Sequence, residues 1–389
     1  MGPTDLARSL AAGQWARVIG WGAYLGCSWT WCIGMFLPVL LVRDFGIWGF
    51  AVFAIPNVIG AMAMGWVLRR PATQAWVREH GAALAWFMRV TLAFEWFFFG
   101  WLASSVHAWW LGLGVLVVGG VWPQPEGRGW RRLALGTWCV SVACALVYLM
   151  TAPASLAIAR TPRLPVGDVG WLAPVCAFGF ALCPYLDLTF HNARRQLEPR
   201  ESRAAFSLGF GMFFFAMIAF TLAYTPLLIE GGLAGMWPLG VAAVAVTIHM
   251  TMRIGFTTFA FVDAFDRLRP QSRMGFAGVG LVALLIAGYL AGYLAAGRRV
   301  HGFEAPELGY RAFMAFYGLA FPAYVWICAI PYRGDASSSP RGRMGAFWLA
   351  VVAAAPCYWL GFIEKRTEWL GVGLGIVLLA RVLGARARK

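Results

Sequence analysis

Long apolar runs alternate with short polar stretches along the whole chain. Twelve such runs cover residues 17–42, 46–68, 81–103, 106–122, 132–152, 169–193, 205–229, 236–262, 274–296, 310–331, 344–363 and 368–384. A helix of about 20 apolar residues spans the hydrocarbon core of a bilayer, and most of these runs reach that length. The pattern therefore predicts an all-α, polytopic membrane bundle with about 12 transmembrane helices in contact with the lipid bilayer.

Lysine and arginine are unevenly distributed between the two sides that these runs define. With the amino terminus inside, the cytoplasmic loops and tails carry 22 of the 32 basic residues and the opposite side carries 8, while Arg89 and Arg253 lie within runs. Positive residues collect on the cytoplasmic side of membrane proteins, so both termini are expected in the cytoplasm. Residues 1–14 lack the apolar core of a cleavable signal peptide. The expected location is the inner, plasma-type membrane of a cell.

Composition supports this class of protein and excludes others. Hydrophobic residues make up 60% of the 389 residues, charged residues 13%, and the mean hydropathy is +0.67. Soluble domains carry about 25% charged residues. The net charge of +15 does not indicate a nucleic-acid partner, because the arginines lie in short loops rather than on one basic face. The eight cysteines all fall in apolar runs without a Cys-x-x-Cys pair, and five histidines are few for a His-rich site. We therefore expect no metal site and no cofactor, with a carboxylate–His site as the one open alternative.

The polar stretches divide the chain into five parts. These are a cytoplasmic amino-terminal tail (1–16), a ten-helix membrane core (17–331), a cytoplasmic loop (332–343), two additional transmembrane helices (344–384) and a basic carboxy-terminal tail (385–389). The loop contains Ser337, Ser338, Ser339 and Pro340, a composition typical of a flexible connection.

The first and the sixth runs are interrupted in a similar way. Gly26 and Gly34 flank a Trp-rich stretch in the first run, and Gly179 precedes Pro184 in the sixth. Both residue types weaken a helical hydrogen-bond ladder, which lipid tolerates only where the backbone faces protein or water. Interrupted helices at matching positions of two halves indicate a transporter binding site. We therefore expect the substrate to contact residues at the two breaks, namely Trp29, Trp31, Cys32, Cys183, Tyr185 and Asp187.

Few ionisable side chains fall at membrane depth. They are Arg89, Glu95, Asp187, His191, His249 and Arg253. Such groups are costly in lipid and are therefore functional candidates. His249 and Arg253 share a helix face, so we expect Glu95 to pair with one of them, either as a structural lock between helices or in proton coupling. Asp187 and His191, also four residues apart, fit either a helix cap or the lining of a charged pathway.

Several stretches resemble the leucine-transporter fold of the amino acid–polyamine–organocation superfamily, and most nearly the sodium:solute symporters. Gly34 to Pro38, then Arg43 to Phe50 and the small-residue stretch to Gly65 resemble the first broken helix of that fold and its successor. Pro184 to Asp187, continuing to Arg194 and Arg195 and then to a Phe-rich run, resembles its sixth helix.

The resemblance implies two inverted repeats of five helices, with the substrate held between the unwound parts of helices 1 and 6. It also implies a sodium ion held by carbonyl groups of the first helix and hydroxyl groups of the eighth. By position, these ligands would be Gly26 and Ser28 with Thr257 and Thr258. Arg253 departs from this pattern, because it lies one turn before Thr257 and brings a cation close to the sodium position.

Three functions compete at this point. The first is a secondary transporter that moves a small organic solute by alternating access, coupled to sodium or to protons. The second is a sensor or assembly subunit on the same scaffold, with a filled central cavity. The third is a membrane-embedded enzyme acting on a lipid, with Asp187, His191 or Glu95 as acid or base in one cavity. The sequence carries none of the motifs of common soluble enzymes, so we expect no enzyme activity.

Overall fold

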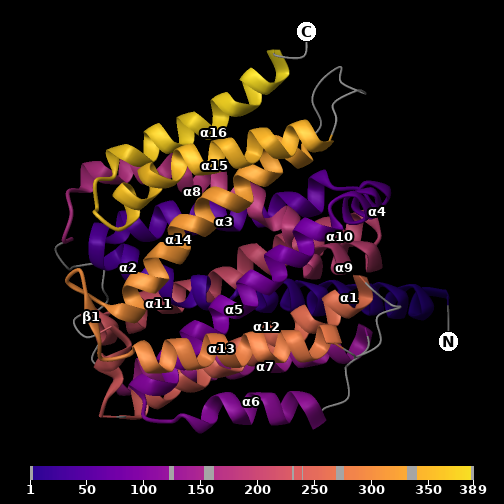
Figure 1. The fold of residues 1–389 in the computed structure, drawn as a ribbon. Coiled ribbons are helices and arrows are strands. Elements are labelled where there is room, and N and C mark those ends of the chain that lie inside the picture. Colours follow the sequence, from indigo (N-terminus) through magenta and orange to yellow (C-terminus); the bar gives the residue numbers. More distant parts are fainter. Residues whose placement is uncertain are drawn as a thin grey trace.

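The structure is a computed structural model that describes residues 3–121, 127–152, 162–229, 232–238, 240–268, 276–330 and 340–386. Helices dominate these residues, and most of them run side by side (Figure 1). In the first half of the chain they are α1 (Pro3–Trp29), α2 (Cys32–Phe45), α3 (Ile47–Val67), α4 (Arg70–Glu79), α5 (Gly81–Ser105), α6 (Trp110–Val121) and α7 (Gly127–Thr151).

The second half continues in the same way. Its elements are η2 (Val166–Asp168), α8 (Val169–Leu182), η3 (Cys183–Leu186), α9 (Leu188–Gln196), α10 (Pro199–Leu208), η4 (Gly209–Phe214), α11 (Phe215–Leu228), η5 (Gly232–Met236), α12 (Val241–Leu268), α13 (Phe276–Ala295), β1 (Arg299–Val300), β2 (Phe303–Glu304), α14 (Ala305–Tyr324), η6 (Val325–Ala329), α15 (Pro340–Phe362) and α16 (Glu368–Arg386). The two short strands pair antiparallel as a hairpin.

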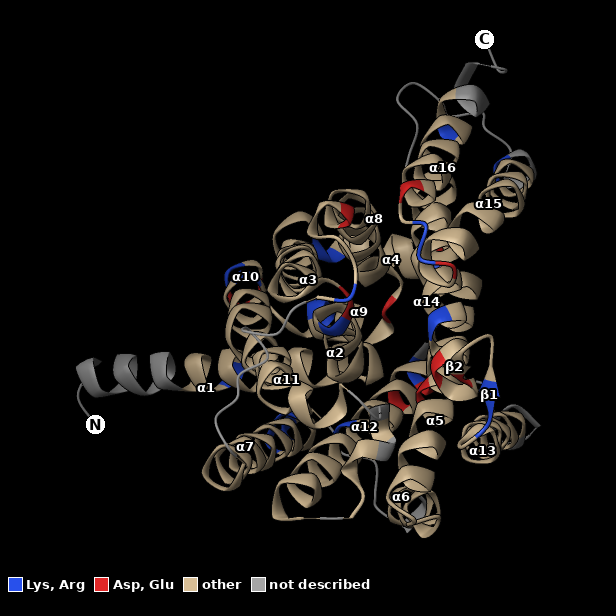
Figure 2. Cartoon of the chain, turned by 90° about the vertical axis from the view of Figure 1, so that its left-hand side faces the viewer, with Lys and Arg blue, Asp and Glu red and all other residues tan. Residues whose placement is uncertain are grey.

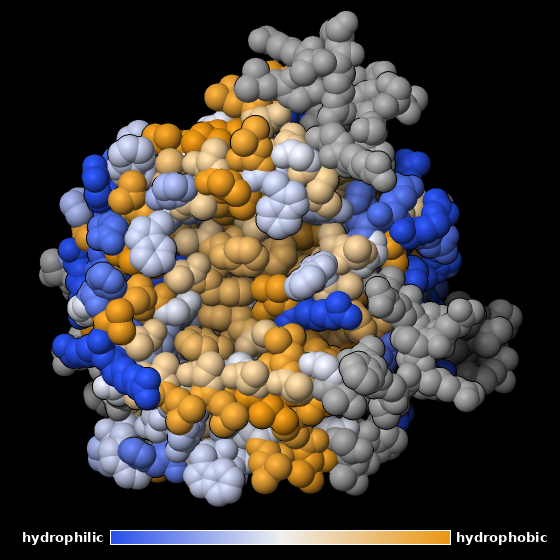
Figure 3. Space-filling view, viewed as in Figure 1, coloured by the Kyte–Doolittle hydropathy of each residue, from blue (hydrophilic) through white to orange (hydrophobic). Residues whose placement is uncertain are grey.

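The chain is an all-α membrane bundle. Among the described residues, eight helices are long and apolar enough to cross a membrane, or nine if the bent pair formed by α1 and α2 is one span. Two shorter apolar helices are Trp110–Gly119 and Gly280–Ala295. Figure 3 shows an apolar surface between two polar margins, as expected for a bilayer-embedded protein. Each of the twelve predicted runs overlaps a helix, while twelve as the number of spans remains a prediction.

Parts of the predicted division lie differently in the structure. The predicted amino-terminal tail belongs to α1, which is already helical at Pro3. Residues 331–339, which hold most of the predicted loop 332–343, are outside the described residues. Helix α15 begins at Pro340, so the last four residues of the predicted loop belong to this helix. The basic tail starts inside α16, and residues 387–389 are also outside the described part.

Both predicted interruptions are present. Between α1 and α2 the chain bends by 59°, and Trp31 adopts an extended conformation just before α2. The second interruption is a 3-10 turn, η3, after which Asp187 is extended and α9 begins. Each predicted broken run is thus built from two α-helices joined by a short segment that is not α-helical. We call α1 and α8 the first halves and α2 and α9 the second halves of these broken helices.

The first halves pack in a reciprocal manner. Helix α1 lies against α10 and η4, two helices after the second break, while α8 lies against α3, directly after the first broken helix. Glycine permits both contacts. A Cβ at Gly26 would lie 2.9 Å from the carbonyl oxygen of Gly209, and one at Gly60 would lie 2.2 Å from that of Phe180. Backbones can approach this closely only where one partner lacks a side chain.

Helix α4 was not expected from the apolar pattern. It is short and amphipathic, with Thr73 and Val77 buried and Arg78 at its exposed end. It packs against α9 and α5. The end of α3 and the second broken helix are thereby connected through a helix outside the candidate spans.

Candidate functional site

The two breaks meet through a chain of hydrogen bonds between buried side chains. The hydroxyl of Thr189, in the first turn of α9, donates to Ser28 Oγ on α1 over 3.1 Å. It also lies 2.6 Å from Asp187 Oδ1, and the Thr189 amide donates to the same oxygen over 2.7 Å. Asp187 is therefore the N-cap of α9, which agrees with one of its two predicted roles. Its second oxygen, Oδ2, is buried and has no hydrogen-bond partner among the residues that the structure describes.

The tryptophans of the first break are enclosed by protein. Trp29 donates from Nε1 to Asn57 Oδ1 on α3 over 2.6 Å, and its ring lies 5.0 Å from that of Phe190 on α9. Trp31 packs edge-on against Tyr317 of α14, with ring centroids 5.6 Å apart. Trp29 therefore connects the first break to α9, whereas Trp31 packs against α14. The sequence did not identify Asn57 and Thr189, although both are polar residues in apolar surroundings and could have been found by that criterion.

The remaining predicted substrate contacts also lie at the breaks. Cys32 is the first residue of α2, and its carbonyl accepts a hydrogen bond from Tyr310 over 3.0 Å. Cys183 is buried at the start of η3. Tyr185 is half-buried, and its carbonyl oxygen lies 2.9 Å from both Trp76 Nε1 and His191 Nε2. His191 therefore contacts the break itself.

The predicted sodium ligands are partly occupied by protein groups. The carbonyl of Gly26 accepts from the Thr30 hydroxyl over 2.6 Å, and the Ser28 hydroxyl lies 3.2 Å from the Leu25 carbonyl. Thr258 Oγ1 accepts from Trp96 Nε1 over 3.0 Å. The neighbouring Thr257 hydroxyl is buried and has no hydrogen-bond partner within the described part of the chain.

The expected pair of Glu95 with Arg253 or His249 is not formed. Arg253 is buried and donates from Nε to Ser141 Oγ on α7 over 2.9 Å, and its guanidinium also lies close to the Cys27 thiol of α1. Both carboxyl oxygens of Glu95 and both ring nitrogens of His249 are buried without a hydrogen-bond partner within the described part of the chain. Spacing defined the shared face of α12 correctly, but the rotation of α5 relative to α12 is not encoded in spacing.

Arg89 also lies away from Glu95. Its guanidinium lies 4.9 Å from the ring centroid of Phe265 on α12, a cation–π contact.

An ion-pair network that the sequence did not predict closes one end of the bundle. Arg43 at the end of α2 makes a bidentate contact with Glu307 of α14. Arg311, one turn further along α14, lies 2.7 Å from Asp44 and 2.9 Å from Glu307. All four side chains are buried, and Figure 2 shows acidic and basic segments together on α14 near β2. We call Arg43, Asp44, Glu307 and Arg311 the charged quartet.

A polar loop covers the charged quartet. The amides of Arg163 and Leu164 donate to the carbonyls of Arg43 and Asp44 over 3.2 and 2.8 Å. Lys365 lies near the quartet, in the turn between α15 and α16. Burial lowers the pKa of its ammonium group, and the nearby Asp44 carboxylate acts in the opposite direction. The end of α2 is thus enclosed by three separate parts of the chain.

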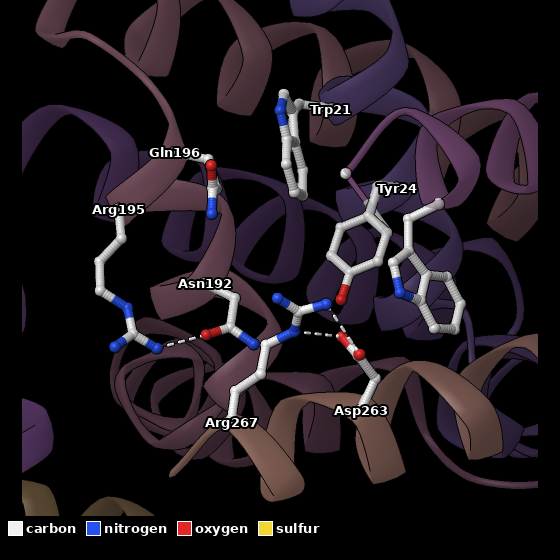
Figure 4. A pocket seen from close by; sticks show the side chains of 9 residues that line it. Trp21, Tyr24, Asn192, Arg195, Gln196, Asp263 and Arg267 are labelled. Carbon is white, nitrogen blue, oxygen red and sulfur yellow. Dashed lines mark hydrogen bonds and ion pairs between the residues drawn. The ribbon is translucent and has the colours of Figure 1, made fainter. Parts of the chain in front are cut away.

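The opposite end of the bundle holds a cavity of about 270 Å³ (Figure 4). It is lined by Trp21, Tyr24, Gly127, Trp130, Asn192, Arg195, Gln196, Asp263 and Arg267. These residues come from α1, α7, α9 and α12, so the cavity lies beside the second half of the second broken helix. Asp263 and Arg267 form a bidentate pair at 2.8 and 2.9 Å, and Arg195 contacts Asn192. The cavity combines indole rings, a phenol, two guanidinium groups and one carboxylate.

Sequence comparison with known proteins identifies no related family. No protein-family model matches the sequence, and no curated protein matches it. The described residues contain no group of three or more His, Cys, Asp or Glu side chains placed to hold a metal ion.

Proposed function

We propose that this integral membrane protein is a transporter of the leucine-transporter type, which moves a small organic solute by alternating access. The observation that carries the proposal is the pair of broken helices, joined at their breaks through Ser28 and Thr189 and packed reciprocally through α1 and α8. A five-plus-five inverted repeat would produce this exchange of neighbours, because the first halves occupy equivalent places in the two repeats.

The two ends of the bundle support a state open toward the cytoplasm. With the orientation that the basic residues favour, the charged quartet lies outside and the cavity inside. The quartet joins α2 to α14, whereas α1 and α9 border the cavity. A solute would leave the breaks between α1 and α9 on the inner side.

Arg253 favours transport that does not depend on sodium. Its guanidinium lies between Ser141 and Cys27, one turn from Thr257, next to the position that the resemblance gives to sodium. A fixed positive charge repels a second cation at short range, and this repulsion is strong in a low-dielectric interior. The arginine would replace the ion as the bridge between α12 and α1.

Distance measurements between two spin labels test alternating access without a known solute. Labels at Gly127 on α7 and Gln196 on α9 report the width of the cavity in lipid nanodiscs. We expect two distance populations, and Glu307→Gln should shift the balance toward the shorter distance because it weakens the outer closure. Glu304→Gln, a half-buried neighbour outside the quartet, is the matched control. A single population that Glu307→Gln leaves unchanged would contradict the proposal.

A thermal-stability screen identifies the solute. A ligand present at about 100 times its Kd stabilises the folded state by about 2.7 kcal/mol, which raises the melting temperature measurably. Amino acids and small organic amines and acids are suitable probes. The shift should disappear in Asp187→Asn, which keeps an acceptor for the cap, and persist in Glu364→Gln, an exposed acid far from the breaks.

One observation favours the second candidate, a sensor or assembly subunit without transport. The side chains at the breaks are packed, as Trp29, Trp31 and Thr189 illustrate, and the cavity begins below them. A non-transporting scaffold would keep one cavity width under every condition, so the spin-label experiment separates the two functions. The side chains of Asp187, His191 and Glu95 make no hydrogen bonds with one another among the described residues, so this geometry gives the enzyme hypothesis no specific support.

A further inference from the structure

Glu95 is the acidic side chain whose environment the structure leaves unexplained. It lies in α5, within a candidate membrane span, and is fully buried. Neither carboxyl oxygen has a hydrogen-bond partner among the described residues. A carboxylate in such a place costs several kcal/mol of desolvation unless a proton or a cation neutralises it. A side chain this costly needs a role beyond packing.

The cationic and titratable groups on α12 and α5 make their contacts with groups other than Glu95 among the described residues. Arg253 is bound to Ser141, and Arg89 lies over Phe265. His249 packs against the ring of Phe220, with centroids 5.2 Å apart. The third arginine of these helices, Arg267, pairs with Asp263, so none of the three is bonded to Glu95 in this state.

The other elements around α5 present neutral groups. Cys32, at the start of α2, is the titratable residue on which the Glu95 charge acts. The hydroxyls of Tyr310 on α14 and Tyr224 on α11 are directed to the carbonyls of Cys32 and Met35. On α13, the Tyr289 hydroxyl donates to the Trp109 carbonyl over 2.6 Å.

The geometry points to Glu95 as the proton-binding site of this protein, and this inference rests on the proposed transport function. In the present state the carboxyl group carries the proton, since no described cation compensates its charge. Loss of the proton to water leaves a carboxylate beside the first turn of α2, which begins at Cys32 without a side-chain cap. Because a helix amino terminus attracts negative charge, the ionised side chain would draw α2 toward α5. Proton binding and the position of α2 are thereby coupled.

Infrared difference spectroscopy tests this inference without a solute. We expect the wild-type protein in nanodiscs to lose a carboxylic C=O band between acidic and alkaline pH, and Glu95→Gln to lack that band. Glu364→Gln, an exposed acid, should keep it. Glutamine is uncharged and nearly isosteric, so the variant should fold, and an unchanged melting temperature at acidic pH checks that it does.

Two results would overturn the proposal. One is a titrating band that persists in Glu95→Gln, and the other is a Glu95 band that does not change with pH. The spin-label distances between α7 and α9 provide the second readout. If Glu95→Gln abolishes their pH dependence while Glu307→Gln still shifts them, both proposals stand. If the distances respond to Glu307→Gln but never to pH, the proton site fails and alternating access remains.

Discussion

The two broken helices are held alike in their first halves and differently in their second halves. Helices α1 and α8 each make a close backbone contact that a glycine permits. For α1 this glycine is its own Gly26, and for α8 it is Gly60 of α3. The second half α2 ends in the charged quartet, whereas α9 is held by hydrogen bonds to backbone carbonyls, such as Arg194 Nε to the Leu68 carbonyl over 2.7 Å. A cavity lies beside α9.

This difference indicates which end of the bundle opens more easily. In a buried ion-pair network, removal of one member leaves uncompensated charge, so the network forms or separates as a whole. A hydrogen bond contributes about 1 kcal/mol, or about 1.5–3 kcal/mol where a charged group such as the Arg194 guanidinium donates, and water entering the cavity can replace it. The α9 end should therefore move in small steps, and the α2 end in one large step.

The largest effect is expected from breaking the charged quartet. Glu307→Ala leaves Arg43 and Arg311 buried with only Asp44, so the free energy of unfolding should fall by about 3–5 kcal/mol. Thermal unfolding in detergent measures the loss. Glu304→Ala, just before α14, should change little. A small loss for Glu307→Ala would show that α2 is not held more strongly than α9.

Alanine substitutions at the two glycine contacts test whether the first halves, α1 and α8, are held in the same way. Gly60→Ala and Gly26→Ala each force a Cβ against backbone, so each should lower stability by about 1–3 kcal/mol, with the greater loss at Gly60 because its contact is closer. Gly179→Ala is the control, since nothing lies within 4 Å of its added Cβ. Equal melting temperatures for all three variants would contradict the packing.

Removal of the Asp187 cap tests the second break alone. Asp187→Ala should cost about 1 kcal/mol, because the Thr189 amide loses its acceptor. Asp187→Asn keeps an acceptor and should retain most of the stability. The first break has no equivalent, since Trp31 provides no side-chain cap. Comparable losses for Asp187→Ala and Asp187→Asn would point to charge rather than capping.

A smaller effect is expected where α4 holds the second break. Trp76→Phe keeps the ring but removes the donor to the Tyr185 carbonyl, which should cost about 0.5–1.5 kcal/mol. Hydrogen exchange of the α4 amides measures this change locally. Trp66→Phe, an exposed tryptophan bonded to Ser207, serves as the control. Unchanged exchange in α4 would contradict the proposed connection.

The smallest effect concerns pH at His80. Burial lowers the pKa of this half-buried imidazole, which lies 3.1 Å from the Tyr324 hydroxyl. Its neutral form is therefore favoured in the folded protein, so its contribution to stability is present above the ordinary histidine pKa of about 6.5 and is lost as pH falls below it. The melting temperature of His80→Gln should decline less on mild acidification than that of the wild type. An identical decline would exclude His80 as a contributor.

The helices and their breaks could be predicted because both depend on local sequence. Apolar length defines a membrane helix. The first break, at Thr30 and Trp31, lies between the helical Gly26 and Gly34, and the second includes Pro184 itself. Contacts between helices were less accessible. The partner of Arg253 is Ser141 rather than Glu95, which depends on how helices are rotated about their axes.

Two features escaped the sequence for different reasons. The charged quartet joins Arg43 and Glu307, which are 264 residues apart, although the i,i+4 pair of Glu307 and Arg311 was visible as a local signal. Helix α4 was missed because it is short and polar, so a search for apolar runs passes over it. The spacing of its buried Thr73 and Val77 is the pattern that reveals it.

The two hydrogen bonds to the Tyr185 carbonyl link the buried second break to the exposed helix α4. A carbonyl oxygen has two lone pairs, and here Trp76 and His191 address both. The turn at η3 cannot rotate without disturbing α4 and α9 together, so an event at membrane depth is carried to a short helix outside the candidate spans. The emission of a fluorophore at the exposed position Arg78 of α4 would then report conformational changes at the buried turn η3.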